Sequence, residues 1–108
     1  MQEEKHGDVL ICFPEREIGI TNAEQLKQAF DDAVNRNEKK LLVDFSAVSY
    51  IDSSGLTMLI EMYQRLKKTG GSLRLCAMNN KIKNIIEITS LDNFFEIFDT
   101  QESALKDF

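Results

Sequence analysis

Short apolar runs alternate with amphipathic helical segments from residue 8 onward, and this alternation constrains the fold more than any other feature. Apolar runs too short for a helix predict strands over residues 8–13, 41–45, 72–77 and 94–98. Apolar residues at helical spacing predict helices over residues 21–34, 56–69, 79–89 and 100–105. The run at 41–45 is apolar almost throughout, which is typical of a central strand covered on both faces. This order predicts an α/β fold, a small mostly parallel β-sheet with about four helices packed on it.

The chain length fits one domain with one core, because two cores in 108 residues would each bury too little apolar surface. We therefore expect a single domain over residues 1–108, in which residues 1–7 form a flexible N-terminal tail. The formal net charge of −5, without a cluster of Lys and Arg, disfavours a nucleic-acid partner. No stretch has the apolar length of a membrane span or the pattern of a signal peptide, so we expect no membrane association and a cytoplasmic location.

The residues that usually carry metal or nucleophilic chemistry are few. Cys12 and Cys76 lie far apart in apolar surroundings, which predicts two free thiols in the core. The single histidine, His6, falls in the predicted tail, and the chain has no Cys-x-x-Cys motif. A metal site therefore lacks ligands, and a serine nucleophile lacks a histidine base. Gly70-Gly71 fits the end of a helix better than a nucleotide-binding loop. We expect no cofactor, no metal and no enzymatic activity.

A polar tetrad, Asp52-Ser53-Ser54-Gly55, lies between the buried strand and the second helix. Ligands of α/β folds bind at this position, where the first amides of a helix lack partners. One interpretation is that Asp52 or Ser53 only caps the helix. The other is that Ser54 is a phosphorylation site and that Gly55, which has no side chain, lets another protein approach. A phosphate would add about −1.5 to −2 charges beside Asp52 and change a binding affinity by roughly 10- to 150-fold.

The role of two methionines on the second predicted helix can be interpreted in two ways. Met58 and Met62, with Arg65, fall on a different helix face from the predicted core stripe. They could form an adaptable protein-binding surface beside Ser54. They could equally pack against a neighbouring helix.

The segment 42–56 reads Leu-Val-Asp-Phe-Ser-Ala-Val-Ser-Tyr-Ile-Asp-Ser-Ser-Gly-Leu. It resembles the signature of the STAS domain family, specifically its stand-alone bacterial anti-sigma factor antagonists. Further agreement comes from the segment 70–76, from Leu91 before the last strand and from residues 103–105. The resemblance extends from about Val9 to Leu105 and implies the STAS fold.

The resemblance also implies a mechanism, called partner switching. The unphosphorylated domain binds an anti-sigma factor that is also a serine kinase, and sigma factor is released to regulate transcription. Phosphorylation by that kinase, which itself binds ATP, reverses the binding. A PP2C-type phosphatase is a further expected partner, and the domain is expected to be a monomer or a weak dimer. The alternative is a STAS scaffold or regulatory subunit of another signalling or transport complex, without regulated phosphorylation.

The family pattern also assigns roles to individual residues. The phosphorylated serine immediately before the glycine corresponds to Ser54, and the aspartate two residues earlier corresponds to Asp52. Ser53 is a neighbour or a cap. The family usually has an aspartate near that serine, in a segment before the first helix, and Gly19 stands in its place here. Thr57 replaces a glycine that often follows and is expected to affect which partner fits. The remaining residues of the expected partner-binding surroundings are Gly55, Leu56, Met58 and Met62.

Overall fold

A five-stranded sheet with strand order β1-β2-β4-β6-β7 organises the computed structural model, which describes residues 1–108. β1 is antiparallel to β2, and the remaining neighbours are parallel. The five strands are β1 (Gln2–His6), β2 (Val9–Phe13), β4 (Lys40–Asp44), β6 (Ser72–Cys76) and β7 (Glu96–Phe98). The central strand β4 is buried from Leu41 to Asp44, as its apolar sequence predicts.

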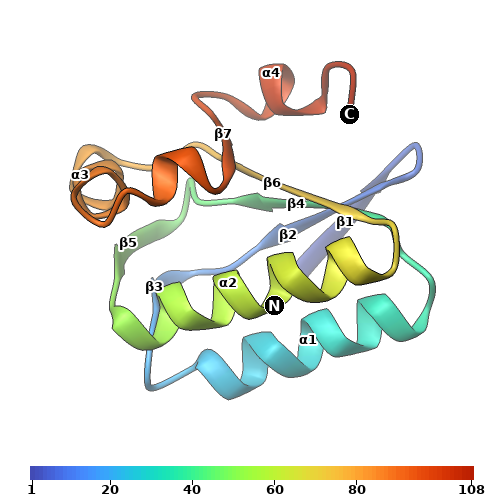
Figure 1. The fold of residues 1–108 in the computed structure, drawn as a ribbon, viewed down its shortest axis with the longest axis horizontal. Helices are drawn as coiled ribbons and strands as arrows, with labels where there is room; N and C mark the ends of the chain where they lie inside the picture. The colour runs from blue at the N-terminus through green and yellow to red at the C-terminus, as the bar shows by residue number, and fades with distance from the viewer.

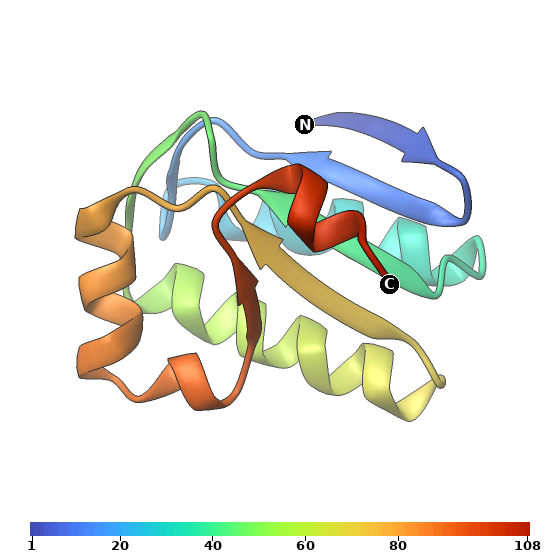
Figure 2. The ribbon, with the colours of Figure 1, turned by 90° about the horizontal axis from the view of Figure 1, so that it is seen from above.

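Helices cover both faces of this sheet. α1 (Ala23–Asn35) and α2 (Ser53–Lys68) lie side by side on one face, and the short helix α4 (Gln101–Leu105) lies on the other (Figures 1 and 2). α3 (Asn80–Ile88) packs beside β5 (Val48–Ile51), and a 3-10 turn, Leu91–Asn93, leads into β7. The four α-helices and the mostly parallel sheet confirm the predicted fold class. None of the helices combines the length and the apolar character needed to cross a membrane.

The side chains of β2 show how the two faces of the sheet differ. Leu10 and Cys12 belong to the large core under α1 and α2, whereas Val9 and Ile11 belong to a smaller cluster under α4. This is the alternation that a strand imposes on its side chains. Cys12 and Cys76 are both free and buried on opposite faces, and burial raises the pKa of each thiol to about 12. The prediction of two free core thiols is confirmed.

Four segments differ from the sequence-based predictions, and one of them, Val48–Ile51, forms strand β5 where no strand was predicted. Residues 1–7 were expected to be a flexible tail, but Gln2–His6 form strand β1. All five β1 side chains are exposed, so no apolar pattern marks the strand, and its backbone pairing with β2 creates it. Arg16–Ile18, for which no strand was predicted, form strand β3, which pairs in parallel with β5 as a separate two-stranded sheet. The last strand is shorter than 94–98, because the 3-10 turn precedes it.

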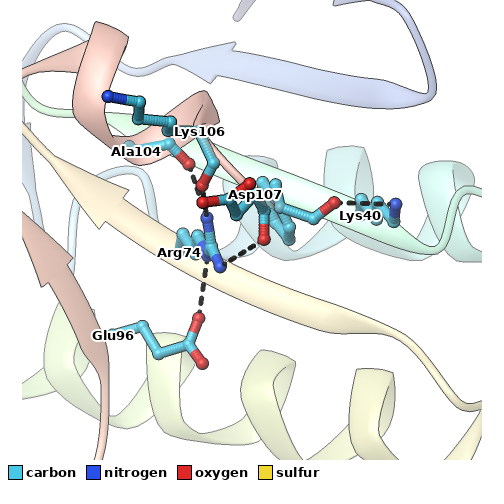
Figure 3. Close-up of polar contacts among 7 residues, drawn as sticks. Lys40, Arg74, Glu96, Ala104, Lys106 and Asp107 are labelled. Atoms are coloured by element: carbon cyan, nitrogen blue, oxygen red, sulfur yellow. Dashed lines mark hydrogen bonds and ion pairs between the residues drawn. The ribbon is translucent and has the colours of Figure 1, made fainter.

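Arg74 on β6 holds the C-terminal segment against the sheet (Figure 3). Its guanidinium donates to the carbonyl oxygens of Ala104, Lys106 and Asp107 at 2.9–3.1 Å and to the Glu96 carboxylate at 2.9 Å. The same group lies 5.0 Å from the ring centroid of Phe98 and 4.4 Å from that of Phe108. One partly buried cation therefore fastens the segment that covers the smaller apolar cluster.

Candidate functional site

The polar tetrad predicted from the sequence lies at the start of α2, beside the β3–β5 ladder (Figure 1). β5 comes between the buried strand β4 and this helix, so the tetrad follows a short edge ladder and not β4 itself. The Asp52 amide donates to the carbonyl oxygen of Ile18 at 3.1 Å, which joins the end of β5 to the end of β3. The end of β3 and the start of α2, which are distant in sequence, therefore lie together at one end of the molecule.

Asp52 is the N-cap of α2. Its Oδ1 accepts the Gly55 amide at 3.0 Å, and its Oδ2 accepts the Ile20 amide at 3.0 Å. These hydrogen bonds, first that of Gly55 and then that of Ile20, hold the pKa of the Asp52 carboxyl below its ordinary value. Of the two capping candidates, the structure selects Asp52, and the ionised carboxylate complements the positive end of the helix dipole.

Gly19 is in direct contact with that carboxylate. A Cβ built at Gly19 would lie 2.3 Å from Oδ2 of Asp52 and 2.6 Å from its Cγ, so any side chain at position 19 requires a shift. Gly19, in the place of the usual family aspartate, contributes no carboxylate here, and Asp52 lies directly beside it. The local chemistry therefore centres on one carboxylate rather than two.

Gly55 has a different role from the one its sequence context suggested. It is buried, and a Cβ there would lie 2.2 Å from the carbonyl oxygen of Ile18. The missing side chain lets the first turn of α2 approach the end of β3. It does not face an incoming protein, so the interpretation that Gly55 lets another protein approach does not fit this geometry.

Ser54 lies in the first turn of α2 on the edge of a groove between α1 and α2. Its side chain is partly exposed, and its hydroxyl makes no hydrogen bond within the chain. Ser53 is exposed, and its carbonyl accepts the Thr57 hydroxyl at 2.9 Å. The groove is lined by residues of both helices: Ala23, Glu24, Lys27, Ser53, Ser54, Thr57, Met58 and Glu61. Ser54 thus offers an unengaged hydroxyl to an incoming group.

Met58 and Met62 do not form an exposed adaptable surface. They are only 5% and 2% exposed and belong to the large core, where α1 packs against α2. Their packing against a neighbouring helix was the other interpretation, and the structure supports it. Leu56 is partly buried against the same core, and Arg65 forms an ion pair with Asp31 of α1.

The sequence did not indicate several residues of this end of the molecule. Ile20 is 78% exposed, although its amide is bonded to Asp52. Glu24, Lys27 and Glu61 line the groove with Ser54. Their only signal in the sequence is a position on the polar faces of α1 and α2, which many solvated residues share. No group of three or more His, Cys, Asp or Glu side chains is arranged to hold a metal ion.

Known proteins resemble this chain along nearly all its length. Residues 1–104 match the STAS domain family. A Thermotoga neapolitana protein named "Putative anti-sigma factor antagonist TM1081 homolog" is 33% identical over 101 residues, 93% of this chain and 89% of that protein. The crystal structure of its Thermotoga maritima counterpart aligns with a TM-score of 0.93 at 29% identity and covers 98% of this chain and 92% of that one. An anti-sigma factor antagonist from Mycobacterium paratuberculosis aligns with a TM-score of 0.87 at 31% identity, over 96% and 88% of the two chains.

Proposed function

This chain belongs to the STAS domain family, and on that premise we propose that it is an anti-sigma factor antagonist whose binding is switched by phosphorylation of Ser54. Relatives similar over most of their length carry that functional name. The observation that carries the proposal is the Ser54 hydroxyl, free of hydrogen bonds in the first turn of α2. The Asp52 cap fixes the backbone of the turn that carries this hydroxyl.

The unphosphorylated domain binds an anti-sigma factor through this end of the molecule, and sigma factor is released. Phosphorylation adds about −1.5 to −2 charges. These charges arise beside the ionised Asp52 and in a groove that two carboxylates, Glu24 and Glu61, and one cation, Lys27, also line. A partner surface that fits the neutral serine then meets a concentrated negative charge, and affinity falls by roughly 10- to 150-fold. The first turn of α2 can hold the phosphate without unfolding, because its amides favour anions.

The arrangement supports a binding protein rather than an enzyme. His6 pairs with Val9 at the start of β2, the end of the sheet opposite the tetrad, so it is not a base for Ser54. Both oxygens of Asp52 are engaged by backbone amides. ATP is bound by the partner kinase, a PP2C-type phosphatase restores the free serine, and the exchange takes place in the cytoplasm.

Phosphorylation in vitro tests the assignment of Ser54. The protein is incubated with ATP, Mg²⁺ and, in turn, each purified anti-sigma factor kinase of its host, and phosphate is located by peptide mass spectrometry. Ser53→Ala is the matched control, because it removes the adjacent hydroxyl, which also donates no hydrogen bond. We expect phosphate on wild type and on Ser53→Ala but none on Ser54→Ala.

Two other outcomes would count against the proposal. Phosphate that persists on Ser54→Ala and disappears from Ser53→Ala would move the switch to the adjacent serine. Tight binding of a partner with no phosphate under any condition would leave a constitutive STAS scaffold, in which Ser54 is only a first-turn residue of α2.

A further inference from the structure

Two exposed isoleucines stand out in a chain whose large apolar side chains are otherwise mostly buried. Ile20 is 78% exposed, and Ile88 is 83% exposed. Ile88 is the last residue of α3. Ile20 lies between β3 and α1, in the segment whose amide is bonded to Asp52. Tyr50, 45% exposed on β5, precedes Asp52 by two residues and adds apolar surface to the segments that adjoin this carboxylate.

The segment that carries Ile20 is held by hydrogen bonds. Asn22 accepts the Gly19 amide on Oδ1 at 2.9 Å and donates from Nδ2 to the carbonyl oxygen of Glu17 at 2.5 Å. The amide of Ile20 donates to Asp52 at 3.0 Å. The backbone of Ile20 is therefore fixed although its side chain is exposed. A partner that covers this side chain need not order the segment, so little conformational entropy is lost on binding.

The position of Ile20 is continuous with that of Ser54. A single carboxylate, that of Asp52, accepts one hydrogen bond from Ile20 and another from Gly55, the residue after Ser54. The segment that carries Ile20 and the helix turn that carries Ser54 therefore meet at one carboxylate, so both belong to the same end of the molecule. Ile88 takes no part in these hydrogen bonds.

We propose that Ile20 is the apolar anchor by which this chain binds its anti-sigma factor, inserting into an apolar pocket of that protein next to the contact with Ser54. The inference rests on the proposed function and adds to it the residue that supplies binding affinity, whereas Ser54 supplies the switch. Truncating an isoleucine that is buried at the centre of an interface weakens binding by about 10- to 100-fold.

Isothermal titration calorimetry with the purified anti-sigma factor and ADP tests the inference. Ile20→Ser is compared with wild type and with Ile88→Ser, a matched control of similar exposure. We expect Ile20→Ser to weaken binding by about 10- to 100-fold and Ile88→Ser to stay within about twofold of wild type. Urea unfolding of both variants checks the fold, since exposed side chains contribute little to stability.

The outcomes separate the two proposals. The anchor would be overturned if the Ile20→Ser variant bound within threefold of wild type, roughly the effect of a rim residue. It would also be overturned if Ile88→Ser lost as much affinity as Ile20→Ser. Either result would leave the antagonist function intact. Wild-type protein that binds no anti-sigma factor of its host would overturn the antagonist function, and the anchor with it.

Discussion

Gly19 and Asp52 approach so closely that a Cβ on Gly19 would lie 2.3 Å from Oδ2 of Asp52. The backbone of Gly19 does not have a positive φ, so the need for glycine arises from this contact. We expect Gly19→Ala to lower the free energy of unfolding by about 1–3 kcal/mol, the usual cost of overpacking. Urea denaturation measures the change.

A double-mutant cycle provides the control for Gly19. In an Asp52→Ala background the carboxylate atoms that lie nearest to the added methyl group are absent. We expect the effect of Gly19→Ala to shrink markedly there, because residues in contact are not additive. Equal effects in both backgrounds would show that the methyl group meets something other than Asp52.

Gly55 makes the corresponding contact with backbone atoms. A Cβ at Gly55 would lie 2.2 Å from the carbonyl oxygen of Ile18, and backbone cannot move aside as a flexible side chain can. We expect Gly55→Ala to lower stability by about 2–4 kcal/mol, whereas Ser54→Ala, which breaks no hydrogen bond within the chain, changes it by less than about 0.5 kcal/mol. A Gly55→Ala protein as stable as wild type would refute the close approach of α2 to β3.

Local sequence patterns predicted the elements that have a clear apolar pattern, such as the continuous apolar run of β4 and the helical spacing of apolar residues in α2. They did not predict β1, because all its side chains are exposed and only its backbone ladder with β2 defines it. The position of Ser54 at a helix start could be predicted from the tetrad. The contact of Ile20 with Asp52 joins residues 32 positions apart, and no local pattern encodes it. Met58 and Met62 were ambiguous, because helical spacing does not show that α1 covers their face.

The ionisation of Asp52 makes part of the stability depend on pH. Hydrogen bonds from Gly55 and Ile20 hold its pKa in the folded protein below the ordinary value. A group with a lowered folded pKa stabilises the fold above its unfolded pKa, and this contribution is lost as pH falls through the folded pKa. We expect wild type to be more stable than Asp52→Asn above about pH 5, and the gap to close below about pH 4. A gap that widens on acidification would contradict this assignment.

Arg74 is expected to hold the C-terminal segment over the smaller apolar cluster. Replacing it by methionine removes the donors to three carbonyl groups and the stacking on two rings, and we expect a loss of about 1–3 kcal/mol. The Cys76 thiol, in the cluster that α4 covers, should then react faster with a thiol reagent, whereas Cys12 on the other face should stay protected.

Lys83→Met is the control for Arg74. It removes only the pair with Asp99, whose side chain is 82% exposed, and exposed pairs contribute little. Equal effects of the two substitutions on Cys76 reactivity would show that the loss of positive charge, and not the release of the C-terminal segment, is responsible.

Control of partner binding by a charge on Ser54 can be tested directly, without an enzymatic phosphorylation step. The full chain is prepared with phosphoserine incorporated at position 54 during translation, and its dissociation constant for the anti-sigma factor is compared with that of the serine form. We expect the phosphoserine form to unfold at a similar urea concentration and to bind at least roughly tenfold more weakly. Equal affinity of the two folded forms would contradict the switch at Ser54.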